Sequence, residues 1–182
     1  SYQKVGFIYR GDLFEVNSAV LLFENQGFDF PRPPLQVRVS LKSEPSYQFI
    51  AIALHLKAGV DDADRERRTR AVMTLTEHLQ TLDLPAVVLG DCNESLDWNV
   101  GVAVFAPLEN AGATLVTLPA ALDGAYSYLP SERLIDHIVV SGAQVDTAVT
   151  VPRLDQAPLD YQGTVSDHLP VVVSWLPDVF AK

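Results

Sequence analysis

The chain of 182 residues has the length of one domain or slightly more, and 48% of its residues are hydrophobic, which is enough for a sizeable core. Thirteen basic and 23 acidic residues give a formal net charge of -10, which repels polyphosphates at long range and restricts any nucleic-acid contact to a local patch. No apolar run approaches the roughly 18 residues of a membrane span, and the single cysteine, Cys92, excludes an internal disulfide.

The first part of the chain predicts strands. It begins with Ser1, directly before the apolar, strand-like run VGFIYR (residues 5–10), so we expect that a preceding segment has been removed. LQVRVSLKS (35–43) alternates apolar and polar residues, as a half-exposed strand does. QFIAIALHLK (48–57) is apolar on both faces until its end, which is typical of a central strand.

One segment, residues 61–83, predicts a helix. It opens with aspartates, which are favourable at the positive end of a helix, and its apolar residues recur at helical spacing. The aspartates are Asp61, Asp62 and Asp64, and the apolar stripe is Val72, Leu75, Leu79 and Leu82. The same segment holds the only dense basic patch, DRERRTR (64–70), whose acidic neighbours favour a solvated helix face over a track for DNA.

The remainder predicts short buried strands separated by irregular chain. The strands are PAVVLGDCN (85–93), LIDHIVVS (134–141) and LPVVVSWL (169–176). Residues 98–129 are rich in Ala, Gly and Pro with weak periodicity, so we expect mostly loop and allow for a short helix. The whole pattern indicates one mixed α/β domain of layered sheets without repeats or linkers.

Polar side chains interrupt four of the apolar runs at their ends. They are His55, then Asp91 with Asn93, then Asp136, and then Asp167 with His168. Because strand ends of a layered α/β protein meet along one rim, these groups are expected to converge on one site, where they could bind a metal ion or move a proton.

Each element also has an ordinary structural interpretation. His55 could be a buried structural histidine, Asp91 and Asn93 could form a turn, and Asp167 could cap or turn the chain before Pro170. His137 points to the opposite face of its strand from Asp136, which favours a supporting or structural role. The joint occurrence of all four interruptions, in order, favours a site.

Four segments resemble the endonuclease/exonuclease/phosphatase superfamily, which includes deoxyribonuclease, abasic-site endonucleases, sphingomyelinases and inositol-polyphosphate phosphatases. They are ALHLKAG, VVLGDCN, LIDHIVVS and SDHLPV, and FPRPPLQV with Arg32 is a weaker match. The resemblance implies a layered α/β/β/α sandwich of the deoxyribonuclease type. Cys92 occupies the packing position of a motif that usually carries an aromatic or aliphatic residue.

The resemblance also implies roles for the residues at the strand ends. Asp167 would be a ligand of Mg²⁺, with Mn²⁺ or Ca²⁺ as possible substitutes, since hard cations prefer carboxylate oxygen. Asp136 would orient His168 and favour its charged form. His55 and Arg32 would contact the phosphate, and Asp91 and Asn93 would position the attacking water and a phosphate oxygen. The implied reaction is hydrolysis of a phosphate ester by in-line attack of water.

The resemblance also implies that something is missing. Members of the family contribute an Asn and a metal-binding Glu from strands that precede the part matched here, so residues 1–182 are expected to be the C-terminal two-thirds of one domain. Glu24, after AVLLF, is a weak candidate for the absent ligand, and the alternative is a solvated residue in a turn.

Two functional classes therefore stay open. The chain is part of a metal-dependent phosphoesterase, or it is a catalytically inactive phosphate-binding or interaction module with the same fold. Nucleic acid, a phospholipid head group and a small phosphodiester all remain possible substrates. A Ser-His-Asp hydrolase built on Ser127 or Ser166 is disfavoured, because neither serine lies in a G-x-S-x-G turn.

Overall fold

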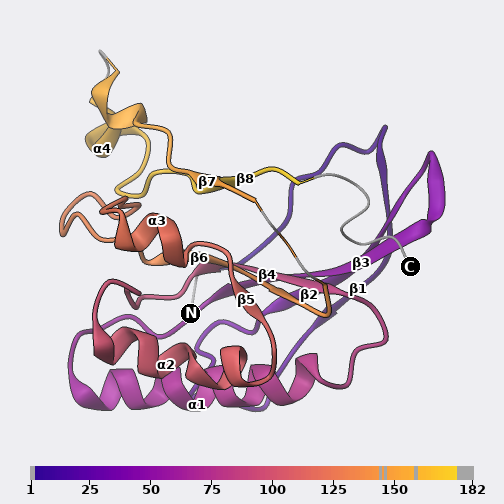
Figure 1. Cartoon of the computed structure of the whole chain (residues 1–182), viewed down its shortest axis with the longest axis horizontal. Coiled ribbons are helices and arrows are strands. Elements are labelled where there is room, and N and C mark those ends of the chain that lie inside the picture. Colours follow the sequence, from indigo (N-terminus) through magenta and orange to yellow (C-terminus); the bar gives the residue numbers. More distant parts are fainter. Residues whose placement is uncertain (1–2, 144, 146, 158–159, 176–182) are drawn as a thin grey trace.

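A six-stranded sheet forms the centre of the computed structural model, which describes residues 3–143, 145, 147–157 and 160–175. In spatial order its strands are β1 (Phe14–Leu21), β2 (Leu35–Leu41), β3 (Glu44–His55), β4 (Ala86–Asp91), β6 (Asp136–Ser141) and β5 (Thr114–Leu115). Helices α1 (Asp62–Leu79) and α2 (Asn99–Asn110) cover one face of this sheet, and a two-stranded sheet, β7 (Val149–Thr150) and β8 (Val172–Val173), lies beyond the other face (Figure 1). The predicted layered α/β architecture is confirmed.

The connection between β3 and β4 sets the geometry of the sheet. These two strands are parallel, and helix α1 makes the crossover between them, whereas β1–β2, β2–β3, β4–β6 and β5–β6 are antiparallel. The helix begins where the aspartates predicted it, because the side chain of Asp61 accepts a hydrogen bond from the backbone N–H of Asp64 at 2.8 Å. The parallel crossover brings the C-terminal ends of β3 and β4 to the same edge of the sheet.

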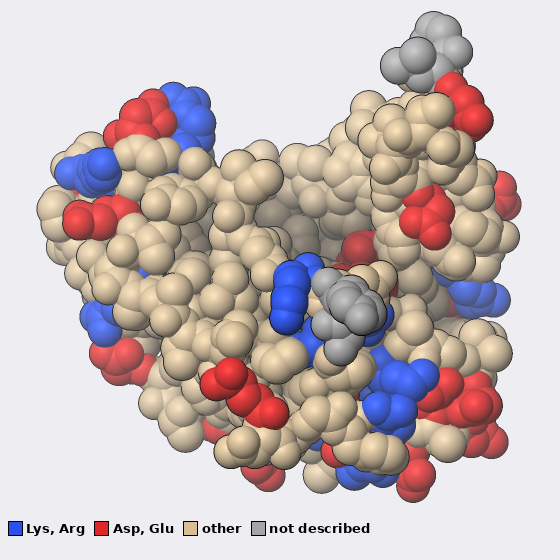
Figure 2. Space-filling view, turned by 180° about the vertical axis from the view of Figure 1, so that it is seen from behind, with Lys and Arg blue, Asp and Glu red and all other residues tan. Residues whose placement is uncertain are grey.

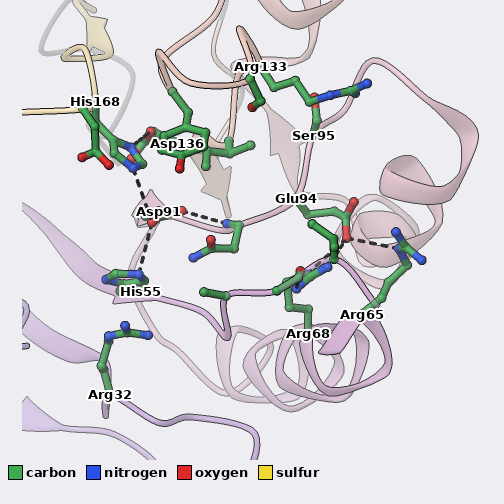
Figure 3. A pocket seen from close by; sticks show the side chains of 18 of the residues that line it. Arg32, His55, Arg65, Arg68, Asp91, Glu94, Ser95, Arg133, Asp136 and His168 are labelled. Atoms are coloured by element: carbon green, nitrogen blue, oxygen red, sulfur yellow. Dashed lines mark hydrogen bonds and ion pairs between the residues drawn. The ribbon is translucent and has the colours of Figure 1, made fainter. Parts of the chain in front are cut away.

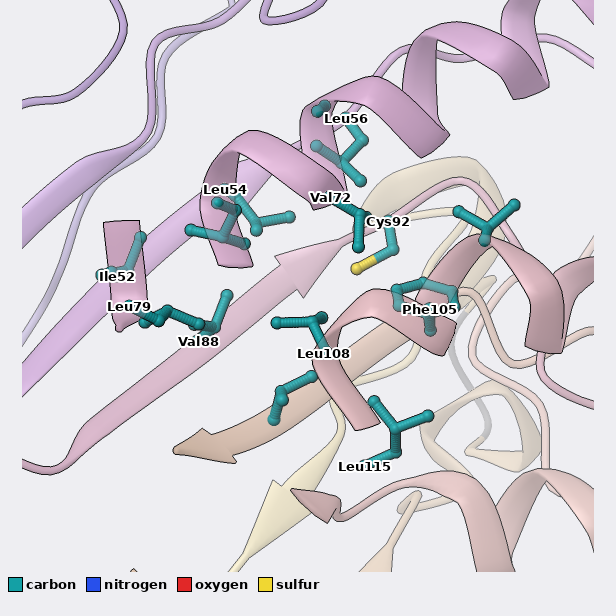
Figure 4. Packing of buried hydrophobic residues seen from close by; sticks show 14 of the residues in the cluster. Ile52, Leu54, Leu56, Val72, Leu79, Val88, Cys92, Phe105, Leu108 and Leu115 are labelled. Carbon is teal, nitrogen blue, oxygen red and sulfur yellow. The ribbon is translucent and has the colours of Figure 1, made fainter. Parts of the chain in front are cut away.

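The core lies between this sheet and the two helices (Figure 4). The predicted helical stripe is confirmed: Val72, Leu75 and Leu79 are buried, and Leu82 packs against the same cluster. Cys92 also lies in this cluster, as its predicted packing position requires. A second apolar cluster joins the opposite face of the sheet to the β7–β8 layer.

The expected loop over residues 98–129 is wrong in part. It contains helix α2, the short strand β5 and a short helix α3 (Leu118–Leu122). Helix α2 has weak local signals, since no side chain caps it and it contains Pro107. Its stability comes from burial of Val104, Phe105 and Leu108 in the core, which periodicity alone does not reveal.

Two further expectations about strands need correction. Residues 5–10 are irregular, with Ile8 fully exposed, because no strand pairs with them in the described part of the chain. The segment 169–175 contains only the partly exposed strand β8 and packs as a thin outer layer, while residue 176 lies outside the described residues. Glu24, the weak candidate for the absent ligand, is exposed in a turn after β1, which agrees with its alternative interpretation as a solvated residue.

Between β7 and β8 the chain forms a 3₁₀ turn (Leu154–Gln156) and the short helix α4 (Tyr161–Thr164). Among the described residues, no helix is both long enough and apolar enough to cross a bilayer.

Candidate active site

Three of the predicted site residues form one row across the sheet. His55 is the last residue of β3, Asp91 is the last residue of β4, and Asp136 is the first residue of β6. The strand register pairs His55 with Asp91 and Asp91 with Asp136. The row therefore follows directly from the pairing of β3, β4 and β6. We call these residues together with His168 the catalytic row, after the role that the sequence predicts for them.

Asp91 lies between two imidazoles. Its Oδ2 is 3.1 Å from Nε2 of His55 and 4.0 Å from Nε2 of His168 (Figure 3). The side chains of His55, Asp91 and His168 are all less than one-third exposed. Charges at such partly buried positions are screened less than charges on the open surface, so the attraction between these side chains is stronger than in an exposed ion pair.

Asp136 orients His168. Its Oδ2 accepts a hydrogen bond from Nδ1 of His168 at 2.7 Å and another from the hydroxyl of the buried Ser127 at 2.6 Å. The hydrogen bond to Asp136 raises the pKa of His168 above that of an ordinary imidazole, burial opposes this shift, and the charges of Asp91 and Asp167 add to it. The predicted pairing is present, and it directs Nε2 of His168 towards Asp91.

The backbone around His168 is fixed by neighbouring residues. The carbonyl of Asp167 accepts a hydrogen bond from the N–H of Leu129, and the N–H of His168 donates to the hydroxyl of Ser166. The Tyr161 hydroxyl donates to the carbonyl of His168 at 3.0 Å. Ser166 and Ser127 thus support the pair as hydrogen-bonding residues.

The end of β4 and the loop that follows it require two unusual backbone conformations. Gly90 has φ = 140°, and a Cβ there would overlap the carbonyl oxygen of Leu54 on β3, so glycine is needed for the two strands to approach. Asn93 has φ = 51°, which asparagine tolerates, and its N–H donates to Oδ1 of Asp91 at 2.8 Å while its side-chain amide donates to the carbonyl of Leu56. These bonds hold both residues at the end of the sheet.

All of the predicted site residues line one cavity of about 740 Å³, a size typical of small-molecule sites. These residues are Arg32, His55, Asp91, Asn93, Asp136, Asp167 and His168. Arg32 is held by Gln3 and reaches the carbonyl of Leu56. Glu24 does not line the cavity.

His137 points away from this cavity. It is 1% exposed and lies on the helix side of the sheet, where its ring nitrogens contact the Thr117 hydroxyl at 2.9 Å and the Glu94 carbonyl at 2.8 Å. Burial lowers the pKa of His137 and so favours its neutral form. This is the structural role that its position opposite Asp136 predicted.

The cavity also contains residues that the sequence did not reveal. They are Arg65, Arg68, Glu94, Ser95, Trp98 and Arg133. The basic segment 64–70 is therefore not simply a solvated face, because Arg68 is 1% exposed and donates to the equally buried Glu94 at 2.8 Å. The helical spacing from Arg68 to Val72, Leu75 and Leu79 was a usable signal, since it places Arg68 on the buried stripe.

The cavity offers few ligands for a divalent metal ion. Asp167 offers an exposed carboxylate on the cavity wall, but the carboxylates of Asp91 and Asp136 are engaged by His55 and His168. Within the described residues no three His, Cys, Asp or Glu side chains gather closely enough to hold a metal ion. Mg²⁺ sites rely on one or two carboxylates completed by water and substrate phosphate, so Asp167 alone is a poor match for firm binding.

Comparisons with known proteins agree with this picture of the fold. The model of the Endonuclease/Exonuclease/phosphatase family matches residues 2–168. Comparison with curated proteins gives no match.

Solved structures share the fold at low identity. An endonuclease/exonuclease/phosphatase from Beutenbergia cavernae is 19% identical with a TM-score of 0.62, and 87% of this chain matches 44% of that chain. The mannosyl-6-phosphatase Bt3783 of Bacteroides thetaiotaomicron is 22% identical with a TM-score of 0.55, covering 91% of this chain and 68% of that one. A D. rerio TDP2 structure complexed with single-strand DNA product is 15% identical with a TM-score of 0.57, covering 89% and 68%. The chain thus spans less than half of the first of these structures.

Proposed function

The chain belongs to the endonuclease/exonuclease/phosphatase family, and from this premise we propose that its cavity is the reaction centre of a phosphoesterase that hydrolyses a phosphate ester by attack of water. One observation carries the proposal. The catalytic row links two histidines and two aspartates at one end of the sheet in a chain of three contacts: His55 to Asp91 at 3.1 Å, Asp91 to His168 at 4.0 Å, and His168 to Asp136 at 2.7 Å.

Each residue of the row has a proposed role. His168, whose protonated form is favoured by Asp136, would donate to a phosphate oxygen and offset the negative charge that builds on the phosphorus centre. Asp91, with Asn93 beside it, would hold the attacking water and accept its proton. His55 and Arg32 would bind the remaining phosphate oxygens, since both line the cavity next to Asp91.

A metal ion is a separate part of the proposal. In this family Mg²⁺, or Mn²⁺ or Ca²⁺ in its place, would neutralise phosphate charge, and Asp167 is the carboxylate that we propose as its ligand here. Because the described residues bring no further ligands to the same point, we propose that residues 1–182 bind such an ion weakly and that a longer chain with a further carboxylate is the efficient enzyme.

Hydrolysis of bis-p-nitrophenyl phosphate and of plasmid DNA by the 182-residue chain and by a longer chain tests the proposal. We expect little turnover by the short chain, and EDTA-sensitive turnover by the longer one that is lost in Asp91→Ala. His78→Ala is the control, because His78 lies on α1 and bonds Gln36 outside the cavity. An inactive longer chain would favour the alternative of a non-catalytic phosphate-binding or interaction module.

The substrate class remains broad in this proposal. Nucleic acid, a phospholipid head group and a small phosphodiester each present the phosphate that the row would bind. The net charge of -10 disfavours non-specific binding of long duplexes.

A further inference from the structure

The cavity extends well beyond the catalytic row. Its wall continues past Asp91 and Asn93 to residues that the proposed hydrolysis does not use, namely Arg65, Arg68, Glu94, Ser95, Trp98, Ser131 and Arg133. Figure 3 shows His55, Asp91 and His168 on one side and Glu94, Arg65 and Arg133 on the other. We call the group of Arg65, Arg68 and Arg133 the arginine end of the cavity.

Arg133 is held in a fixed orientation at this end. Its guanidinium lies 4.2 Å from the centre of the Trp98 ring, and its Nη1 donates to Oδ1 of Asp97 at 3.1 Å. Asp97 is itself fixed by the hydroxyl of Ser95 at 2.7 Å. A guanidinium stacked on an aromatic ring loses little further freedom when it binds an anion, so its affinity for one is increased.

Arg133 also keeps donors for a ligand. Its side chain is 37% exposed, and within the described part of the chain its Nε and Nη2 donate no hydrogen bond. The planar fork of a guanidinium matches the oxygens of a phosphate or carboxylate. Arg133 is therefore built to receive an anionic group from the cavity.

A surplus of positive charge surrounds Glu94. This carboxylate is 2% exposed and accepts two hydrogen bonds from Arg68, at 2.8 and 3.1 Å. Arg65 Nε lies 3.4 Å from the same oxygen without forming a hydrogen bond, and the other contact of Arg65, to Asp62, is to a fully exposed carboxylate. One buried carboxylate thus faces two guanidinium groups, and the exposed Asp62 is screened by water.

The two ends of the cavity therefore differ in charge. Three aspartates, Asp91, Asp136 and Asp167, lie at or beside the row with one arginine, Arg32. Three arginines and one carboxylate, Glu94, line the other end, where Asp97 pairs with Arg133 from outside the cavity wall. The face of the molecule in Figure 2 is hollowed, and Lys and Arg side chains lie below the hollow with Asp and Glu side chains among them. In a chain with a net charge of -10, such a gathering attracts anions only locally.

We propose that the arginine end binds a second anionic group of the substrate, so that the preferred substrate is a small phosphate ester carrying a further phosphate or comparable anion. The inference rests on the proposed function only in placing the scissile phosphate at the catalytic row. Arg133 is the residue that contacts the second anion, and Arg65 contributes attraction. A nucleobase stacked on Trp98 is disfavoured, because the guanidinium of Arg133 already covers a face of that ring.

Calorimetric binding of alkanediol monophosphates and bisphosphates to the 182-residue protein, without metal, tests the proposal. The linkers run from about two to about six carbon atoms, so that no span has to be assumed. At one linker length we expect the bisphosphate to bind about tenfold more tightly than the monophosphate of the same linker. Arg133→Gln should remove most of this advantage, and Arg133→Lys should restore part of it.

Arg153→Gln is the matched control. Arg153 also lies over an aromatic ring, 4.4 Å from the centre of Tyr126, and also pairs with an aspartate, Asp155, at 2.7 Å, but it does not line this cavity. The variant should keep the full bisphosphate advantage. Circular dichroism of each variant verifies that it is folded.

Several results would overturn the inference: equal affinity for both ligand classes at every linker length, no measurable binding of either class, or an advantage that survives Arg133→Gln. An advantage lost equally in Arg133→Gln and Arg153→Gln would show general charge attraction and would also overturn it. If the longer chain fails to hydrolyse phosphate esters while the Arg133-dependent advantage is present, the proposed function is wrong and the anion site stands. Hydrolysis without such an advantage would leave the proposed function intact and refute the anion site.

Discussion

Replacing Arg68 by Met should destabilise the protein strongly, because Arg68 joins the two loops that carry the site. Its Nη1 donates to the carbonyls of Lys57 and Gly59, which follow His55, at 2.8 and 2.9 Å. Its Nε and Nη2 donate to Glu94, which follows Asn93. Both Arg68 and Glu94 are at most 2% exposed.

The expected loss of unfolding free energy follows from the Glu94 carboxylate, which Arg68→Met leaves without its main partner. An unpaired buried carboxylate costs about 3–5 kcal/mol. Arg65 lies 3.4 Å from the same Glu94 oxygen and becomes its remaining partner, which places the loss at the lower end of that range, about 3 kcal/mol. For a chain of this size that loss lowers the melting temperature by roughly 6–12 °C.

Urea and thermal unfolding of Arg68→Met, Glu94→Gln and the double variant measure this loss. Because the double variant leaves no charge unpaired, it should lose clearly less stability than the sum of the two single variants. Arg70→Met, on the same helix but in a half-exposed pair with Asp29, should change the midpoint little. A loss below about 1 kcal/mol in Arg68→Met, or strict additivity in the double variant, would refute the reasoning.

Three other predictions concern the site. Gly90→Ala should cost about 2–3 kcal/mol in urea unfolding, because its φ of 140° and the Leu54 carbonyl both oppose a side chain; unchanged stability would contradict the backbone geometry. Asp136→Asn should lower the pKa of His168 measured by NMR titration. The ion pair of His168 with Asp136 stabilises the fold most below the unfolded-state pKa of about 6.5, and this stabilisation is lost as pH rises through the higher folded-state pKa. The difference in unfolding free energy between wild type and variant should therefore shrink towards alkaline pH. Cys92, whose thiol pKa is raised by burial, should react with a thiol reagent only on unfolding, and rapid labelling of the native protein would show that it is accessible.

Sequence patterns predicted that the residues of the catalytic row come together, because each polar residue lies at the end of an apolar run. His55, Asp91 and Asp136 each interrupt an apolar run, and runs of this kind are strands whose ends meet at one edge. The order of the motifs along the sequence does not predict which of these side chains contact each other. That Asp91 lies between His55 and His168 depends on the parallel pairing of β3 with β4, which is a long-range property.

The arginine end was not predicted, for a physical reason. The charged residues in DRERRTR look solvated, because charged side chains are rarely buried. Arg68 is buried because it pairs with Glu94, which lies 26 residues later in the chain. Trp98 directly precedes α2 and Arg133 lies shortly before β6, so they become neighbours only when the chain folds. Helix α2 was missed similarly, because packing of Phe105 and Leu108 stabilises it where local signals are weak.

The central claim is that the catalytic row acts on a phosphate ester, and the hydrolysis rate of His168→Ala in the longer chain tests it most directly. His168 bonds Asp136 at 2.7 Å and faces Asp91, so its loss should lower metal-dependent hydrolysis of bis-p-nitrophenyl phosphate by about a hundredfold or more while the protein stays folded. Adding Asp91→Ala to His168→Ala should lower the rate little further, because residues that act as a unit are not additive. Full turnover by a folded His168→Ala variant would contradict the account.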